Sequence, residues 1–248
     1  MLVAGVACWR LFSELATVKP VLMAGHSLGE WSALVASGAV DFSEAVKLVK
    51  HRAQLMQSAI PADESGMAAI LGLEDEQVIE LCQKASQDSL VEAVNFNSPG
   101  QIVVAGRKDA VERLMLAAKD AGAKRALPLA VSVPSHSSLL SDAGRQLFEA
   151  IDLKSFRKPN VPIVHNVDAK QHHTAEAIRD AVSAQIYKPV LWVDCVNAAK
   201  SEGVDTFIEV GPGKVLAGLC KRIDRSLNIG AFESVASITK TMDILSGE

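Results

Sequence analysis

Short apolar runs alternate with amphipathic segments along most of the chain, which predicts strands and helices in turn. The first clear apolar run is 20–25, and it is followed by a tight turn and by a segment with apolar residues at helical spacing. Another run at 206–210 ends at a Gly-Pro-Gly turn and again precedes a helical pattern. Strands that alternate with helices are typical of a parallel sheet covered on both faces, so the chain is predicted to be an α/β protein.

The middle of the chain has a different order of elements. Between 66 and 131 the pattern predicts strand, helix, strand, strand, helix and strand, with a hairpin turn at 97–100. The predicted strands are 67–71, 90–95, 101–105 and 126–131, and the predicted helices are 75–86 and 108–121. This order is that of a ferredoxin-like unit. We therefore predict a ferredoxin-like subdomain at 61–134, inserted into an α/β core formed by 1–60 and 135–248.

The turn after the first apolar run has the sequence Gly25-His26-Ser27-Leu28-Gly29, which fits the G-x-S-x-G pattern of a nucleophile elbow. In such an elbow the serine lies on a sharp strand-to-helix turn, where side chains two positions to either side would clash. The serine is then at a helix N-terminus, and the N–H of the next residue can face a developing oxyanion. The pattern also arises by chance at ordinary turns, but the apolar strand before it and the helix after it favour a nucleophile.

A serine nucleophile needs a base, and the chain has six histidines. His136 follows the segment that leaves the middle unit and returns to the main α/β pattern. His165 ends a predicted strand, where a hydrogen-bonded structural histidine is the common case. Spacing does not choose between these two, and the residues favour His136. The other four lie in the elbow, on the polar side of a helix or in a polar loop: His26, His51, His172 and His173.

Arg52 is the most informative charged residue. It lies on the same predicted helix face as Ala45, Val49 and Met56, so its guanidinium is expected to face inward. Burying a guanidinium without a partner is costly. Two partners fit: a carboxylate within the protein, or the carboxylate of a substrate held by two parallel hydrogen bonds.

Composition narrows the classes of function. The 248 residues are 49% hydrophobic and 22% charged, an ordinary globular balance. A net charge of −4 and an aromatic content of 4% argue against nucleic acid as a partner. The four cysteines have no paired spacing, which fits a reducing compartment and neither a disulfide framework nor a zinc site. No apolar run is long enough to span a bilayer, so we expect a cytoplasmic protein that does not bind membranes.

The chain carries, in order, the segments GHSLGEWSALVASGAV, NFNSPGQIVVAG, LPLAVSVPSHSSLL, QIYKPVLW and IEVGPGKVLAGL. Together with the helix that bears Arg52, these segments resemble the malonyl-CoA:acyl carrier protein transacylase family of bacterial fatty acid synthesis, over essentially the whole chain. The resemblance implies an α/β hydrolase-like parallel-sheet core with an inserted ferredoxin-like α+β subdomain, in agreement with the pattern above. The GHSLG motif alone also suits the acyltransferase domains of polyketide synthases.

The resemblance also implies roles for individual residues. Ser27 matches the nucleophile and His136 the base, while Arg52 matches the residue that binds the malonyl carboxylate. Gln185 matches the position whose backbone carbonyl orients the histidine in place of a triad aspartate. Two further residues match positions near the active-site cleft on the small subdomain: Asn95 and Gln101.

The implied reaction moves the malonyl group from malonyl-CoA to the phosphopantetheine thiol of acyl carrier protein, through a malonyl-serine ester. It needs no metal or redox cofactor, since the coenzyme A thioester is a substrate. We expect a monomer whose partners are malonyl-CoA and acyl carrier protein. Because that carrier is acidic, a local basic patch is expected, with three candidates: Lys221-Arg222 with Arg225, Lys124-Arg125, and Arg157-Lys158.

Three alternatives remain from the sequence. A serine esterase would share the elbow, but its histidine should come late in the chain after an acidic partner. A polyketide-type acyltransferase would differ mainly in its flanking modules. A catalytically impaired fragment would bind its partners without turnover.

One departure from the family motivates the last of these alternatives. Family members begin with a strand that ends in Gly-Gln-Gly-Ser-Gln, whose first glutamine supplies a second oxyanion N–H. No such motif occurs in this sequence, and only residues 1–26 precede Ser27. We therefore expect an N-terminally truncated chain, in which a missing oxyanion donor would slow the reaction roughly a hundred- to a thousandfold.

Overall fold

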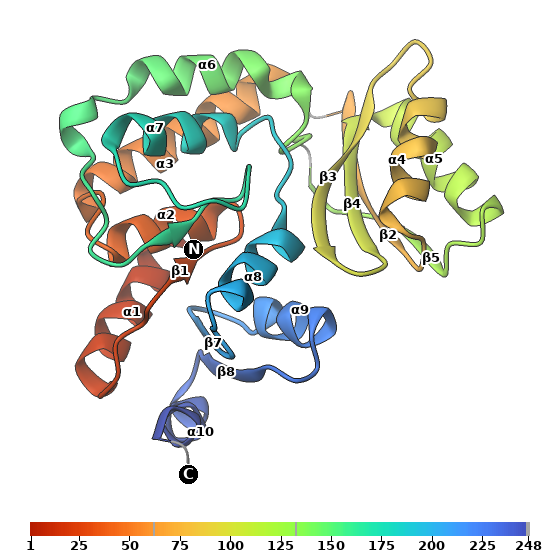
Figure 1. The fold of residues 1–248 in the computed structure, drawn as a ribbon. Coiled ribbons are helices and arrows are strands. Elements are labelled where there is room, and N and C mark those ends of the chain that lie inside the picture. The colour runs from red at the N-terminus through yellow and green to blue at the C-terminus, as the bar shows by residue number, and fades with distance from the viewer. Residues whose placement is uncertain (62, 132, 247–248) are drawn as a thin grey trace. The chain divides into compact units, whose positions relative to one another are not determined.

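The computed structural model describes residues 1–61, 63–131 and 133–246 (Figure 1). The chain divides into two compact units. The first consists of Met1–Lys47, Leu153–Ile178 and Val193–Glu248, and the second of Leu48–Asp152 and Arg179–Trp192. This division groups more of the chain with the middle segment than the predicted 61–134 does. The predicted boundaries, with a core of 1–60 and 135–248, stay a prediction.

The second unit contains a four-stranded antiparallel sheet with the order β3-β4-β2-β5. Its strands are β2 (Ser65–Leu71), β3 (Val91–Ser98), β4 (Gln101–Arg107) and β5 (Arg125–Pro128), and the helices α4 (Asp75–Ala85) and α5 (Lys108–Asp120) lie between them in sequence. Apolar side chains of the sheet and of both helices form one buried core that includes Ile70, Val104 and Leu114. The six elements occur in the order that the sequence predicts.

The same unit continues after the sheet with a 3-10 turn at Ser138–Leu140 and with α6 (Ser141–Ala150). Ser132, in the segment predicted to lead to His136, lies outside the described residues. Gly144 of α6 is needed for a close approach, because a Cβ there would lie 2.3 Å from a ring carbon of Tyr187. This contact packs α6 against the segment that follows α7 (Ala175–Ala184).

The first unit contains parallel strand pairs, as the α/β prediction requires. Strand β1 (Met23–Ala24) pairs with β6 (Ile163–Val164), and β7 (Thr206–Val210) pairs with β8 (Asn228–Phe232), both in parallel. The α/β class with parallel strands is thus confirmed. Strand β1 is shorter than the predicted 20–25, and β6 ends one residue before His165.

The remaining α-helices of the described residues are α1 (Leu2–Leu15), α2 (Leu28–Ala36), α3 (Phe42–Ala59), α8 (Trp192–Ser201), α9 (Val215–Ile223) and α10 (Val235–Ser246). Helix α1 buries Leu2, Val6 and Phe12, and the Phe12 ring meets the edge of Phe232 on β8 at a centroid distance of 5.4 Å. None of the described helices is long and apolar enough to cross a membrane. The expected cytoplasmic location stays a prediction.

Candidate active site

Ser27 lies in the turn that joins β1 to α2, at the N-cap of the helix. Its backbone has φ 52° and ψ −111°, an unfavourable conformation for a residue with a side chain. A Cβ at Gly25 would lie 2.1 Å from the carbonyl carbon of Gly29, so the turn requires glycine at position 25. A Cβ at Gly29 would meet no described atom within 4 Å. The predicted steric requirement therefore applies to the first glycine and is wrong for the second.

Leu28 is the first residue of α2. Its N–H belongs to the first turn of a helix, where amide groups have no acceptor within the helix and where the helix dipole is positive. The N–H of Glu30 in this turn already donates to the carbonyl oxygen of Ser27 at 3.1 Å. The position of Leu28 is thus suited to an oxyanion, and its role stays a prediction.

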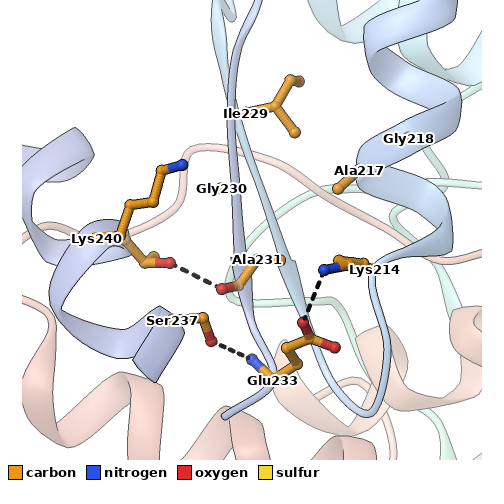
Figure 2. A pocket seen from close by; sticks show the side chains of 10 residues that line it. Lys214, Ala217, Gly218, Ile229, Gly230, Ala231, Glu233, Ser237 and Lys240 are labelled. Atoms are coloured by element: carbon orange, nitrogen blue, oxygen red, sulfur yellow. Dashed lines mark hydrogen bonds and ion pairs between the residues drawn. The ribbon is translucent and has the colours of Figure 1, made fainter. Parts of the chain in front are cut away.

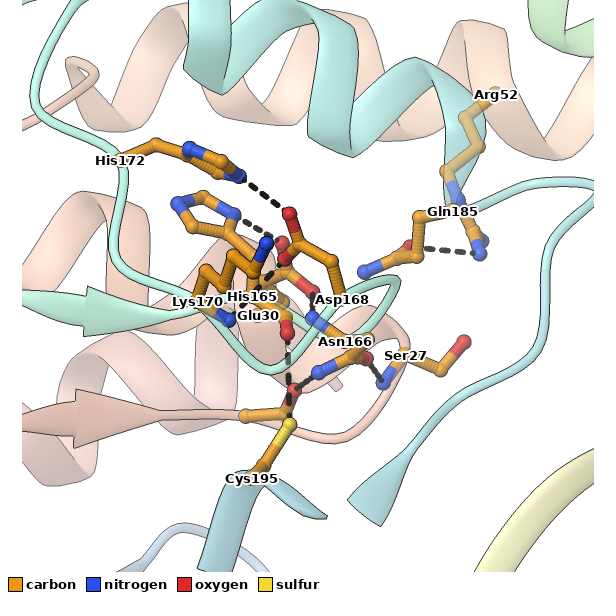
Figure 3. Close-up of polar contacts among 11 residues, drawn as sticks. Ser27, Glu30, Arg52, His165, Asn166, Asp168, Lys170, His172, Gln185 and Cys195 are labelled. Carbon is orange, nitrogen blue, oxygen red and sulfur yellow. Dashed lines mark hydrogen bonds and ion pairs between the residues drawn. The ribbon is translucent and has the colours of Figure 1, made fainter. Parts of the chain in front are cut away.

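An asparagine that the sequence analysis did not identify binds the elbow. Asn166 is fully buried; its Oδ1 accepts a hydrogen bond from the Ser27 N–H at 2.7 Å, and its Nδ2 donates to the Gly25 carbonyl at 2.8 Å. The backbone N–H of Asn166 in turn donates to Glu30 Oε2 at 3.1 Å. Figure 3 shows these contacts around Ser27. In the sequence, Glu30, an acidic residue three positions after the serine, is a signal that could have pointed to such a network.

His165, the other candidate for the base, belongs to this network. Its ring is fully buried and its Nδ1 donates to Glu30 Oε1 at 2.7 Å. A carboxylate can only accept hydrogen bonds, so this contact fixes the proton on Nδ1. Both nitrogens of the His165 ring are buried away from solvent, as is expected of a structural histidine.

His136 lies in the second unit and is 3% exposed. Its backbone N–H donates to the Ile186 carbonyl at 2.9 Å, and its Nδ1 donates to the Gln185 carbonyl at 2.6 Å. Since a carbonyl only accepts, Nδ1 carries the proton and Nε2 keeps its lone pair. This is the tautomer that a general base requires. The backbone of His136 has φ 68°, so this residue, like Ser27, has a positive φ without being a glycine.

Arg52 lies on α3 and is 7% exposed, so the expectation that it faces inward is confirmed. Its Nη2 donates to Gln185 Oε1 at 3.2 Å, as Figure 3 shows. Gln185 itself is fully buried. One residue therefore contacts both candidates in this unit, binding Arg52 through its side chain and His136 through its backbone carbonyl.

Asn95 and Gln101 lie on neighbouring strands of the antiparallel sheet. Asn95 is buried on β3, where the register with β4 shifts on both sides of it, and it forms an isolated bridge with Val190. Gln101 is the first residue of β4 and pairs with Leu71. Their predicted place near a substrate cleft stays a prediction.

The basic candidates differ in how far their charges already have local partners. Arg157 donates from Nε to the Gly38 carbonyl at 2.8 Å and forms an ion pair with Asp41. Lys221 donates to the Leu227 carbonyl at 2.8 Å. Within the described residues, no group of three or more His, Cys, Asp or Glu side chains could hold a metal ion.

A pocket of about 430 Å³ lies in the first unit, between α9, β8 and α10 (Figure 2). An ion pair between Lys214 and Glu233, 3.9 Å apart, spans part of it. The residues that line the pocket are Lys214, Ala217, Gly218, Ile229, Gly230, Ala231, Glu233, Ser237, Lys240 and Thr241. The candidate catalytic residues are not among them, so this pocket gives no support to the predicted chemistry.

The family model and the curated relatives that match this chain all describe acyl transferases. The family model described as acyl transferase domain matches residues 1–243. The malonyl CoA-acyl carrier protein transacylase of Salmonella typhimurium is 48% identical over 242 residues, which cover 98% of this chain and 78% of that protein. The enzyme of the same name from Bacillus subtilis is 41% identical over 249 residues, which cover 100% of this chain and 78% of that protein.

Solved structures show the same similarity. The acyl carrier protein S-malonyltransferase of Vibrio cholerae matches with a TM-score of 0.92 and 49% identity, over 96% of this chain and 78% of that one. The malonyl-CoA:acyl carrier protein transacylase of Xanthomonas oryzae matches with a TM-score of 0.95 and 47% identity, over 98% and 77%. A third match is a malonyl-transacylase in complex with its type II PKS acyl-carrier protein. Its TM-score is 0.94 and its identity 48%, over 98% of this chain and 78% of that one.

Proposed function

The chain belongs to the family of malonyl CoA-acyl carrier protein transacylases, and from this premise we propose that Ser27 carries the malonyl group between its two thiol partners. The reaction is the transfer of malonyl from malonyl-CoA to the pantetheine thiol of acyl carrier protein, a step of fatty acid synthesis. The observation that carries the assignment of roles is the hydrogen bond from His136 Nδ1 to the Gln185 carbonyl, 2.6 Å long. It leaves His136 Nε2 as the proton acceptor that a serine nucleophile needs.

The finer description of the fold is part of the same proposal. We infer that β2 to β5 with α4 and α5 form a ferredoxin-like subdomain, inserted into an α/β hydrolase-like core. The β-α-β-β-α-β order and the antiparallel arrangement β3-β4-β2-β5 support this inference.

The first half-reaction forms the acyl-enzyme. His136 Nε2 takes the proton of the Ser27 hydroxyl as its oxygen attacks the thioester carbonyl of malonyl-CoA. The carbonyl oxygen becomes an oxyanion, to which the Leu28 N–H donates. When the intermediate collapses, the C–S bond breaks and His136 returns its proton to the sulfur. Coenzyme A leaves as a thiol, and a malonyl ester stays on Ser27.

The second half-reaction reverses these steps with a different thiol. The pantetheine thiol of acyl carrier protein gives its proton to His136 and attacks the ester carbonyl. The ester C–O bond breaks, and the Ser27 oxygen takes the proton back from His136. Because the first product leaves before the second substrate reacts, the kinetics are ping-pong.

Arg52 supplies selectivity in this scheme. A guanidinium donates two parallel hydrogen bonds to a carboxylate, a geometry that the malonyl group offers and an acetyl group lacks. The burial of Arg52 and the neutral amide of Gln185 beside it support this role. Acyl carrier protein is the proposed second partner; its docking surface and the expected monomeric state of the chain stay predictions.

The proposal is tested by incubating the chain with malonyl-CoA and recording its intact mass. A malonyl adduct is expected on the wild type, and peptide mapping should place it on Ser27. Ser27→Ala should form no adduct, and His136→Ala should form it far more slowly. Addition of holo acyl carrier protein should remove the adduct and yield malonyl-carrier. An unmodified wild-type chain, or an adduct that persists in Ser27→Ala, would refute the assignment.

A further inference from the structure

The side chain of Asn166 makes the hydrogen bonds that a neighbouring strand would make to the elbow. Strands β1 and β6 pair in parallel only as far as Ala24 and Val164. Beyond that point Asn166 Nδ2 donates to the Gly25 carbonyl and Oδ1 accepts from the Ser27 N–H, at 2.8 and 2.7 Å. A primary amide presents N–H donors and a carbonyl acceptor in one plane, so it can replace both the N–H and the C=O of a peptide group. The side chain thus extends the ladder from β6 across the turn.

The elbow needs this support because its backbone is strained. Ser27 has φ 52° and ψ −111°, and a residue with a side chain adopts such a conformation only where its surroundings fix it. The two contacts of Asn166 lie on either side of residue 26, so they hold the turn at both its entry and its exit. The direction in which the Ser27 side chain leaves the backbone follows from this backbone geometry.

Asn166 is itself held by a buried carboxylate from the elbow's own helix. Glu30, in the first turn of α2, accepts from the Asn166 N–H at 3.1 Å through Oε2 and from His165 Nδ1 at 2.7 Å through Oε1. All three residues are 0% exposed. A fully buried carboxylate is costly unless donors satisfy its oxygens, and these two contacts do so. The contacts close a ring that runs from the elbow to Asn166, on to Glu30 and back through α2.

We propose that Asn166, held in place by Glu30 and His165, is a positioning residue that keeps the Ser27 hydroxyl in its reactive direction. The inference rests on the proposed function, because it presumes that Ser27 is the nucleophile. It assigns a task to residues that contact the backbone of Ser27 and no reacting atom. If Asn166 had a purely structural role, its substitution would lower stability only. If it is a positioning residue, its substitution also lowers the reaction rate of enzyme that is fully folded.

The test uses Asn166→Ala, which removes both contacts, and Asn166→Asp, which keeps the acceptor for the Ser27 N–H and loses the donor to Gly25. Loss of two hydrogen bonds that fix the reactive geometry should lower the rate of Ser27 acylation by malonyl-CoA about 10- to 100-fold. Asn166→Asp should also lower the rate at least about 10-fold, because it places a carboxylate oxygen against the Gly25 carbonyl in place of a donor. KM for malonyl-CoA should stay within about twofold of the wild type, because the substrate contacts are unchanged.

Ser37→Ala is the matched control. Ser37 is buried at the other end of α2, and its hydroxyl donates to the Leu34 carbonyl at 3.1 Å. The substitution should lower the melting temperature without changing the acylation rate. All rates are compared below the melting temperature of the least stable variant, and circular dichroism establishes that each is folded. If Asn166→Ala does not fold, Asn166→Asp decides the question.

A second readout separates this inference from the proposed function. A fluorophosphonate reacts with an activated serine whatever its natural substrate, so its rate of labelling Ser27 reports the nucleophile alone. The inference predicts the same order of rates for labelling as for malonylation. It is overturned if a folded Asn166 variant labels and acylates Ser27 at the wild-type rate. If instead the wild type is labelled at Ser27 but never malonylated, the proposed function fails and the order of labelling rates still decides the role of Asn166.

Discussion

Replacing Arg52 by methionine should abolish the preference for a malonyl over an acetyl thioester while the chain still folds. Arg52 is 7% exposed, so a neutral side chain of similar length fills its space and avoids the cavity that alanine would leave. A hydrogen bond to a charged group contributes about 1.5–3 kcal/mol, and a guanidinium offers a carboxylate two of them. A loss of about 3 kcal/mol lowers kcat/KM for malonyl-CoA roughly 150-fold. The rate with acetyl-CoA should not fall, because the acetyl group makes neither hydrogen bond.

The assay is the rate of Ser27 acylation, followed by intact mass over a range of malonyl-CoA or acetyl-CoA concentrations. Arg52→Lys serves as the matched control, since it keeps the charge and loses the two-pronged geometry; its malonyl preference should lie between those of the wild type and Arg52→Met. If Arg52→Met kept the wild-type ratio of the two kcat/KM values within about twofold, Arg52 would not bind the carboxylate. The internal ion pair that the sequence left open would then be the better explanation of its burial.

Two further predictions concern the second unit. Gln185→Ala removes the side-chain amide that contacts Arg52 but keeps the backbone carbonyl that binds His136. KM for malonyl-CoA should therefore rise about fivefold, while the rate of acetylation by acetyl-CoA is unchanged. An equal fall in the rates of malonylation and acetylation would contradict this prediction. Hydrogen bonds from Ser89 and Arg113 lower the pKa of Asp109 from 3.8 to about 2, so they stabilise the fold above pH 3.8 and this stabilisation is lost as the pH falls toward 2. The difference in melting temperature between the wild type and Asp109→Asn should therefore shrink as the pH falls from 3.8 to about 2, and a constant difference would refute this.

The sequence predicts the fold well where one local signal suffices. The six elements from β2 to β5 follow from alternating and helical apolar spacing, because each element packs one face on a common core. Strand β8 has no clear signal in the sequence, because Gly230 interrupts it and glycine weakens a strand pattern. A Cβ at Gly230 would lie 2.6 Å from Ile208 Cδ1, the end of a side chain on the paired strand β7, so that side chain would have to shift. Close packing between distant strands has no signature within a single short window of sequence.

In the candidate site, too, the residues with a local sequence signal could be predicted and those that depend on distant contacts could not. The turn at Ser27 could be predicted because its steric requirement lies within five consecutive residues. The inward direction of Arg52 follows from helical spacing. Asn166 could not be found, because it contacts Ser27 across 139 positions and sits in a polar loop of ordinary composition. The tautomer of His136 likewise depends on a carbonyl 49 positions away.

A neutral group orients the imidazole of His136, and this has an electrostatic consequence for the guanidinium nearby. The Gln185 carbonyl accepts from His136 Nδ1 at 2.6 Å, and the Gln185 side chain accepts from Arg52 Nη2 at 3.2 Å. If an aspartate carboxylate oriented the imidazole instead, it would also attract the Arg52 guanidinium and compete there with the substrate carboxylate. Such a carboxylate, as a fixed part of the protein, would weaken the binding of every substrate carboxylate to Arg52. An uncharged carbonyl aligns the imidazole ring and adds no negative charge beside Arg52.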